Sequence, residues 1–368
     1  MPLAAQAAQA ALAALETRQR LILGVAALLT ALAGVTVVAG SGAVVRFTFA
    51  GLALAGTAAV VGEAIEAVGD KVGPAPTGLL QSTLGNLPEL FVGIFALQKG
   101  LTGVVQAALV GSVLANSLLV LGIAFVVGGL RHGTQRFEPE LPRLIASMLL
   151  LVVASLLVPT LAHSLGSPAA AHSATLSKGL AVILLVVYLT SIPYFLRHSP
   201  TGSASSAGGR RDVHPTWPLA LSIAVLALGS AAAAAAADWF VGPLETATKS
   251  LGLTQTFTGL VVVAIASNAV ENAVGIRFAL RAKPEYVIST TLNSPLQVAL
   301  LLTPVLVLLS SAIGPTPLTL VFPPLLVVAL GVSTLVVTVV IYDGEFTWIE
   351  GVALIALYAI LGAAFWWG

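Results

Sequence analysis

Long apolar runs separated by short polar connections dominate the hydrophobic pattern of this chain. A helix rises about 1.5 Å per residue, so about 20 apolar residues cross the hydrocarbon core of a bilayer. Runs of that length occur eleven times, at residues 21–40, 45–68, 77–98, 102–129, 142–162, 175–196, 217–247, 256–280, 286–311, 318–341 and 348–367. The pattern therefore predicts an all-α polytopic membrane protein with eleven transmembrane helices.

The composition of the chain supports this fold class. Of 368 residues, 58% are hydrophobic and only 8% are charged, so a soluble fold would lack the polar side chains to cover its surface. The formal net charge of +1 and the scattered basic residues argue against nucleic acid as a partner, and leave the lipid bilayer as the main environment. The chain has no cysteine, which excludes disulfides and thiolate metal sites.

The distribution of basic residues predicts an orientation in the membrane. With the N-terminus in the cytoplasm, twelve lysines and arginines fall in inner connections or at inner span ends. Only Arg46, Lys99, Lys178 and Lys249 then lie outside. Because cytoplasmic connections carry the excess of positive charge, we expect a multi-pass protein of the cell (inner) membrane with a cytoplasmic N-terminus and an outer C-terminus.

Two parts of the chain resemble each other at an offset of 182 residues. The pattern N-x-x-E occurs at 86–89 and 268–271, and the same offset takes Glu63 to Glu245 and Ser112 to Ser294. An odd number of predicted spans separates the copies, so the two parts have inverted orientations, as is typical of secondary transporters. We expect an N-terminal segment with the first helix at 1–44, a five-helix repeat at 45–197, a Ser/Gly-rich cytoplasmic linker at 198–216 and a second five-helix repeat at 217–368.

The first copy of the pattern places a carboxylate about halfway through an apolar span. A charge at the bilayer midplane costs on the order of 3 kcal/mol or more unless it is compensated, so Glu89 is a functional candidate. Pro88 has no backbone N–H, which leaves the carbonyl of Leu84, beside that of Gly85, without its helical partner. Carboxylate and carbonyl oxygens are the ligands that hard cations such as Ca²⁺ prefer.

Three runs of the sequence carry a resemblance to a known family: GNLPELFVGIFALQKG (85–100), QAALVGSVLANSLLVLG (106–122) and FTGLVVVAIASNAVENAV (257–274). They resemble the two alpha-repeats of the Ca²⁺/cation antiporter superfamily, most closely its cation/proton exchanger (CAX) branch, and the likeness covers about residues 45–341. The resemblance implies that the helices bearing the two signatures cross at mid-membrane and that their glutamates bind Ca²⁺ or protons alternately.

The resemblance also implies roles for individual residues. Glu89 and Glu271 would be the cation ligands, with Asn86 and Asn268 as supporting amides. Ser112, Ser294 and Gln297 would line the same cavity, and Glu66 matches an acidic residue near the cytoplasmic end of the second span.

The second signature departs from the family pattern, which usually reads GNAAEH. Ser267 stands where a glycine would favour a helix break, so we expect a weaker break there. Asn272 replaces a histidine that could titrate. The segment Asn293-Ser294-Pro295 stands where a Gly-Ser pair is common, which leaves the shape of the pocket and its ion preference open.

The function implied is export of Ca²⁺, or of further divalent cations, in exchange for H⁺ by alternating access, with no cofactor beyond the transported ions. Two glutamates in one dehydrated cavity repel each other and readily take up protons. Ca²⁺ must then expel those protons to bind. Either Ca²⁺ or protons can neutralise the two glutamates, so protons are the favoured coupling ion. A sodium- or potassium-coupled exchanger of the same superfamily is the alternative.

Other interpretations stay open for several residues. Ser112, Ser294 and Asn293 fit interhelical hydrogen bonds as well as ion contacts. Glu63, Glu66 and Glu245 lie near span ends, where they are either gate or vestibule groups or side chains that extend to the water interface. A channel and an intramembrane enzyme are rival classes, but all five histidines fall in connections or at span ends and no HExxH or GxSxG occurs. Ion selectivity, stoichiometry and assembly as a homo-oligomer stay undetermined.

Overall fold

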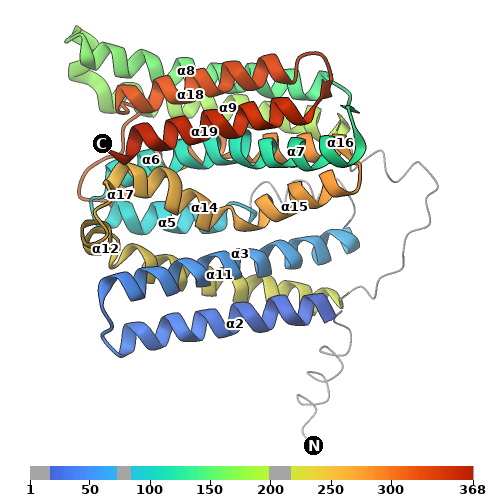
Figure 1. The fold of residues 1–368 in the computed structure, drawn as a ribbon. Helices are drawn as coiled ribbons and strands as arrows, with labels where there is room; N and C mark the ends of the chain where they lie inside the picture. Colours follow the sequence, from blue (N-terminus) through green and yellow to red (C-terminus); the bar gives the residue numbers. More distant parts are fainter. Residues whose placement is uncertain (1–16, 73–83, 199–216, 368) are drawn as a thin grey trace, which may run out of the picture. The chain divides into compact units, whose positions relative to one another are not determined.

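The computed structural model describes residues 17–72, 84–198 and 217–367, apart from the side chains of residues 66, 69–72, 196–198 and 269–273. This part of the chain is almost entirely helical (Figure 1). It divides into two compact units, the first comprising residues 1–92 and 201–250 and the second residues 93–200 and 251–368. Each unit therefore combines segments from both halves of the sequence.

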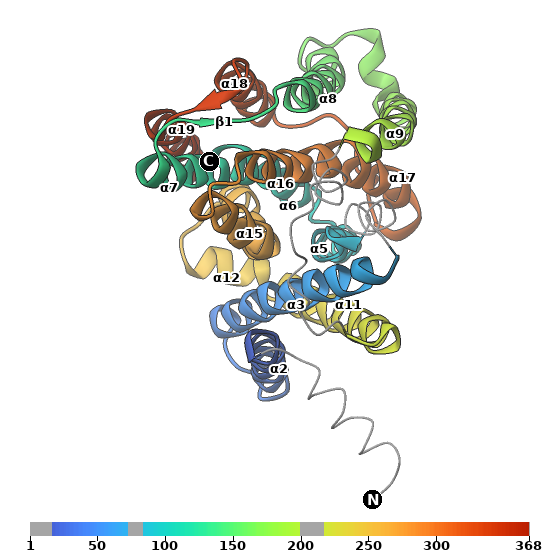
Figure 2. The same ribbon diagram turned by 90° about the vertical axis from the view of Figure 1, so that its right-hand side faces the viewer.

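Unit 1 is built around three helices that lie side by side (Figures 1 and 2). Its elements are α2 (Thr17–Val38), α3 (Ala43–Val72), α11 (Leu219–Val241), α12 (Leu244–Ser250) and the start of α5 (Leu87–Gln98). Small residues allow the close approach of these helices, because a Cβ at Gly56 of α3 would lie 3.2 Å from the Cα of Ala26 in α2. Phe47 and Phe240 stack with ring centroids 4.5 Å apart and join α3 to α11.

Unit 2 contains the remaining helices and three short π-helical stretches. Its elements after α5 are α6 (Thr102–Leu114), the π-helix η1 (Ala115–Val120), α7 (Leu121–His132), β1 (Gln135–Arg136), α8 (Glu140–Ser164), the 3₁₀-helix η2 (Pro168–His172), α9 (Ser173–His198), α13 (Gln255–Phe257), the π-helix η3 (Thr258–Val263), α14 (Ala264–Ser267), α15 (Ala269–Leu280), α16 (Pro284–Gln297), the π-helix η4 (Val298–Leu302), α17 (Thr303–Ile313), α18 (Pro324–Val340), β2 (Glu345–Phe346) and α19 (Trp348–Trp366). Close packing of α7 on α19 depends on glycine, since a Cβ at Gly122 would lie 2.8 Å from the carbonyl oxygen of Gly351.

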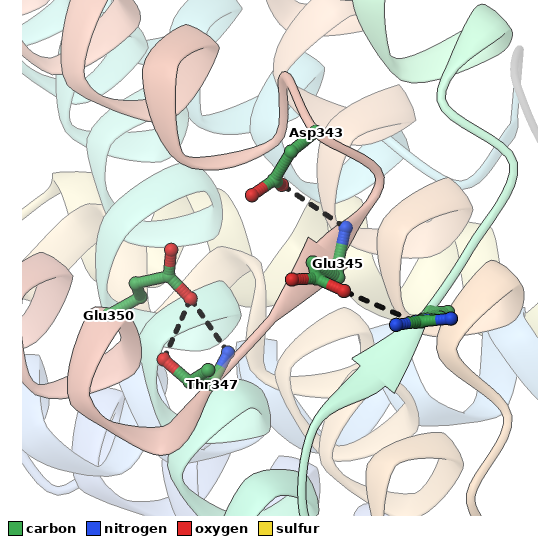
Figure 3. Close-up of polar contacts among 5 residues, drawn as sticks. Asp343, Glu345, Thr347 and Glu350 are labelled. Carbon is green, nitrogen blue, oxygen red and sulfur yellow. Dashed lines mark hydrogen bonds and ion pairs between the residues drawn. The ribbon is translucent and has the colours of Figure 1, made fainter.

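A two-stranded antiparallel sheet, which the hydrophobic pattern did not predict, joins the connection after α7 to the connection after α18. Gln135 pairs with Phe346, and Arg136 pairs with Glu345 through both the backbone and a side-chain contact of 3.2 Å (Figure 3). Glu350 accepts hydrogen bonds from the backbone and hydroxyl of Thr347, which caps the start of α19 (Figure 3). The sheet thus joins the two connections that lead from α7 and into α19.

The lengths and compositions of the helices are those of a polytopic membrane protein. Among the described residues, eight helices are long and apolar enough to cross a membrane, and nine if α12 and α13–α14, bent by 118°, form one span. The shorter apolar helices Leu87–Gln98 and Pro324–Val340 add to this set.

One expected span is wrong at its start. Residues 318–323 were expected to be helical, but the helix begins at Pro324, and residues 317–323 have no regular secondary structure. We call this non-helical segment the strap. Pro323 and Pro324 stand where helical hydrogen bonds would otherwise continue, and buried side chains bind the strap backbone instead.

Candidate functional site

The first signature lies at a helix break in unit 1. Leu84 is helical, Gly85 and Asn86 form a turn, and α5 begins at Leu87. Pro88 therefore stands in the first turn of α5, where its missing N–H is tolerated, and the N–H of Leu90 donates to the carbonyl of Asn86 at 3.0 Å. Asn86 is buried, and Glu89 is half-buried with its Oε2 atom inside the protein. The carboxylate is thus held at the N-terminal end of a short helix, which favours negative charge.

The second signature forms a helix break in unit 2 without a glycine or a proline. Helix α14 ends at Ser267, and α15 begins at Ala269. The side chain of Asn268 donates to the carbonyl of Ala264 at 2.8 Å, and its backbone N–H donates to the same oxygen at 3.2 Å. The break that was expected to be weakened by Ser267 is therefore present. Glu271 lies in the first turn of α15, and its side chain is outside the described residues.

A buried polar network surrounds Asn268. Its Nδ2 donates to Ser112 Oγ at 2.9 Å, and its Oδ1 accepts from Asn116 Nδ2 at 2.7 Å. Asn116 Nδ2 also lies 3.2 Å from Ser294 Oγ. All four residues are at most 5% exposed. Unit 2 therefore brings together three sequence-predicted residues, Ser112, Asn268 and Ser294, from three different segments of the chain.

Asn116 is the member of this network that the sequence analysis did not single out. It lies in η1, where a π-helical turn follows α6, and π-helical turns are frequent at functional sites. Its spacing of four residues from Ser112 puts both side chains on one helix face. The spacing from Ser112 could have indicated a shared polar face, because a buried asparagine in an apolar helix requires hydrogen-bond partners.

The chemistry of the network is that of neutral oxygen ligands. Asn268 Oδ1 lies within hydrogen-bond distance of both Asn116 Nδ2, at 2.7 Å, and Ser112 Oγ, at 3.2 Å. Because an amide oxygen has two acceptor positions, one of these contacts must rearrange before the oxygen binds a cation. No group of three or more His, Asp or Glu side chains that could hold a metal ion occurs within the described residues. Hydroxyl and amide oxygens, which this network contains, are among the ligands that complete the shell of 6–8 oxygens around a hard cation such as Ca²⁺.

Gln297 ends α16 three residues after Ser294 and is half-buried. Its backbone position is next to η4, as Asn116 lies within η1. The π-helical turns thus follow both of the helices that supply serines to the network.

The predicted gate or vestibule residues are held in ion pairs where their side chains are described. Glu63 of α3 lies 2.6 Å from Arg18 Nη2 of α2, and its side chain is 10% exposed. Glu245 pairs with Lys249 one helical turn away at 2.9 Å, and its side chain is 50% exposed. Of these two pairs, the first joins two helices and has a mostly buried glutamate, although the side chain of Arg18 is 49% exposed. The side chain of Glu66 is outside the described residues.

Comparisons with known proteins agree in the family that they indicate. The chain matches the family described as "Sodium/calcium exchanger protein" over residues 42–197 and 221–367. It is 38% identical to the Ca(2+)/H(+) antiporter of Synechocystis sp. over 342 residues, covering 89% of this chain and 92% of that protein. It is 30% identical to vacuolar cation/proton exchanger 3 of Oryza sativa subsp. japonica, covering 87% of this chain and 79% of that protein.

The fold is also similar to that of a solved structure. The structure of native YfkE superposes with a TM-score of 0.80 at 28% sequence identity, covering 94% of this chain and 100% of that chain. With the matched family and the relatives above, this similarity shows that the chain belongs to the sodium/calcium exchanger protein family, in the cation/proton exchanger branch that its two signature segments resemble.

Proposed function

We propose that this protein is a secondary antiporter that exports Ca²⁺ from the cytoplasm in exchange for H⁺. Family membership and the names of its relatives, which are Ca²⁺/H⁺ antiporters and cation/proton exchangers, support this function. The observation that carries it within the chain is the buried network of Ser112, Asn268 and Ser294, because neutral oxygens from opposed segments are what a cation site needs around its carboxylates.

The proposed architecture is one N-terminal helix followed by two inverted five-helix repeats, eleven helices in all. Matching helix starts support the repeats, because three pairs of helices begin 182 residues apart. These pairs are α5 (from Leu87) with α15 (from Ala269), α6 (from Thr102) with α16 (from Pro284), and α7 (from Leu121) with α17 (from Thr303). The domain limits proposed are 1–44, 45–197, 198–216 and 217–368. The proposed orientation has the N-terminus in the cytoplasm and the C-terminus outside, following the positive-inside rule.

In the proposed mechanism, Glu89 and Glu271 bind either one Ca²⁺ or protons. Asn86 and Asn268 support them, the carbonyls of Leu84 and Gly85 add oxygens, and Ser112, Ser294 and Gln297 line the cavity. Two charged carboxylates without a bound ion are too costly to carry through a low-dielectric barrier, so the site can change its access only with Ca²⁺ or protons bound. The exchange is therefore obligatory and needs no covalent chemistry or resident cofactor.

Ion-specific flux in proteoliposomes tests this function. Gradients of H⁺, Na⁺ and K⁺ are imposed separately on liposomes that contain the purified protein, and Ca²⁺ movement is recorded. We expect the H⁺ gradient alone to drive Ca²⁺ uptake that saturates. Uptake driven only by Na⁺ or K⁺ would assign the protein to the cation-coupled alternative, and conduction without exchange would indicate a channel.

A further inference from the structure

The strap, residues 317–323, is a non-helical segment whose backbone binds side chains of neighbouring helices. Alternate residues point inward, since Leu318, Leu320 and Phe322 are at most 2% exposed. Their N–H groups donate to Ser310 Oγ at 2.8 Å, Ser177 Oγ at 2.8 Å and Thr160 Oγ1 at 3.1 Å, from α17, α9 and α8. Non-helical backbone that is buried requires such partners, because an unsatisfied N–H group away from water is costly.

Gln106 of α6 binds the other edge of the strap. Its Nε2 donates to the carbonyl of Val321 at 2.8 Å and to that of Thr319 at 3.2 Å. An amide nitrogen has two N–H donors, so both are used on the strap. Gln106 is only 9% exposed, and its hydrogen bonds therefore join α6 to the strap in a water-poor environment.

The same helix that Gln106 anchors carries the polar network. Ser112 follows Gln106 by six residues, about 9 Å along the helix axis, and Asn116 follows in η1. Helix α6 is thus tied to the strap near its start and to Asn268 and Ser294 further along. A shift of α6 along or about its axis would move Ser112 and Asn116 relative to Asn268.

The corresponding place in the second half of the chain lacks this connection. An offset of 182 residues takes Gln106 to Ile288, and takes Thr319 back to Phe137. The side chain of Ile288 cannot donate a hydrogen bond. A cavity of about 110 Å³ lies beside it, and Phe137 and Glu138 are among the other residues that line this cavity. A hydrogen bond from a side-chain amide to a neighbouring connection is therefore present at this position of α6, and the side chain of Ile288 cannot make one at the corresponding position of α16.

We propose that Gln106 is a positioning residue for ion binding: by fixing α6 to the strap, it keeps Ser112 and Asn116 in register with Asn268 and Ser294. This role rests on the proposed function. The Nε2 atom of Gln106 is bound to the strap carbonyls of Thr319 and Val321 rather than to any residue of the network. It acts on binding through the position of α6.

The test uses the full-length protein in proteoliposomes and the substitution Gln106→Met, which keeps the length of the side chain and removes its donors. We expect the KM for Ca²⁺ to rise about three- to tenfold, the loss typical of one or two buried hydrogen bonds, while the maximal rate stays within about twofold. Hydrogen exchange of the strap amides should become faster. Ile288→Met, at the corresponding position of α16, is the matched control and should leave KM and strap exchange unchanged.

A second variant distinguishes loosening of the strap from loss of its connection to α6. Ser177→Ala removes the partner of the Leu320 N–H on α9, so it should speed strap exchange without raising KM. If Gln106→Met does not insert, Gln106→Asn, which shortens the reach of the amide, replaces it with the same expectation.

Two results in a Gln106 variant would overturn the proposal. One is an unchanged KM together with faster exchange of the strap amides, and the other is exchange of the strap amides at the wild-type rate. Failure of the proposed function is distinguishable from both, because it appears as absence of Ca²⁺/H⁺ exchange in the wild-type protein.

Discussion

The two signature segments interrupt their helices at corresponding places but by different means. In the first, Pro88 removes a backbone donor, and the turn at Gly85 and Asn86 leads into α5. In the second, the side chain of Asn268 donates to the carbonyl of Ala264, and no glycine or proline is involved. The first break is thus encoded by a residue that cannot continue a helix. The second depends on a side chain that is also bonded to Ser112 and Asn116.

This difference predicts different sensitivities. A proline imposes its break whatever its neighbours are, so the first signature should tolerate changes in surrounding helices. The second break should respond to the loss of its distant partners, because those partners orient the asparagine. Substitutions in each copy can test this comparison.

The largest effect is expected where the two copies act alike. Glu89→Gln and Glu271→Gln each remove one of the two negative charges proposed to bind the divalent ion, so each should reduce Ca²⁺ transport by about 100-fold or more. The measurement is Ca²⁺ uptake into proteoliposomes, normalised to inserted protein. Glu285→Gln is the control, since Glu285 is exposed in the first turn of α16 and belongs to no proposed site, and should retain transport. Near-normal uptake in either signature variant would rule out its ligand role.

A smaller effect is expected from Asn268→Leu. The change leaves Ser112 and Asn116 buried without their shared partner, at a cost of about 1–3 kcal/mol, and should lower Ca²⁺ affinity about 5- to 100-fold and the melting temperature as well. Asn293→Leu is the matched control, because within the described residues its Nδ2 donates to Ser289 Oγ of its own helix at 3.2 Å rather than to the network. Equal losses in the two variants would show that the network around Asn268 has no special part in binding.

The smallest effect is expected from Pro88→Ala. Alanine restores a backbone donor, so the helix can close on the carbonyl of Leu84 and withdraw that oxygen from the ion. We expect Ca²⁺ affinity to fall a few-fold, about 1 kcal/mol, with folding intact. A titration of initial uptake rate against Ca²⁺ concentration measures it. An unchanged affinity would mean that Gly85 or the packing around the turn sets the break in the first copy.

Family membership and the helical membrane fold followed from the sequence, because apolar runs and the two N-x-x-E signatures can be read directly from it. The strap did not, because residues 318–322 are as apolar as a helix and the local signal, Pro323 and Pro324, lies at the end of that apolar run. The side chains that bind its backbone, such as Ser177 and Thr160, are distant in the sequence. The pairing of Glu63 with Arg18 was missed for the same reason, because α2 lies outside the repeated pattern. Asn116 went unnoticed because its counterpart at the offset of 182 is Val298, so the repeat gave no sign of it.

Coupling of Ca²⁺ to protons is the central claim, and an acid pulse tests it most directly. Vesicles that contain the protein are loaded with Ca²⁺, the external medium is acidified, and Ca²⁺ release and luminal pH are followed together. We predict that Ca²⁺ leaves while the lumen acidifies, with or without Na⁺, because protons and Ca²⁺ compete for the same carboxylates. Release that requires Na⁺ and leaves the luminal pH unchanged would contradict the account.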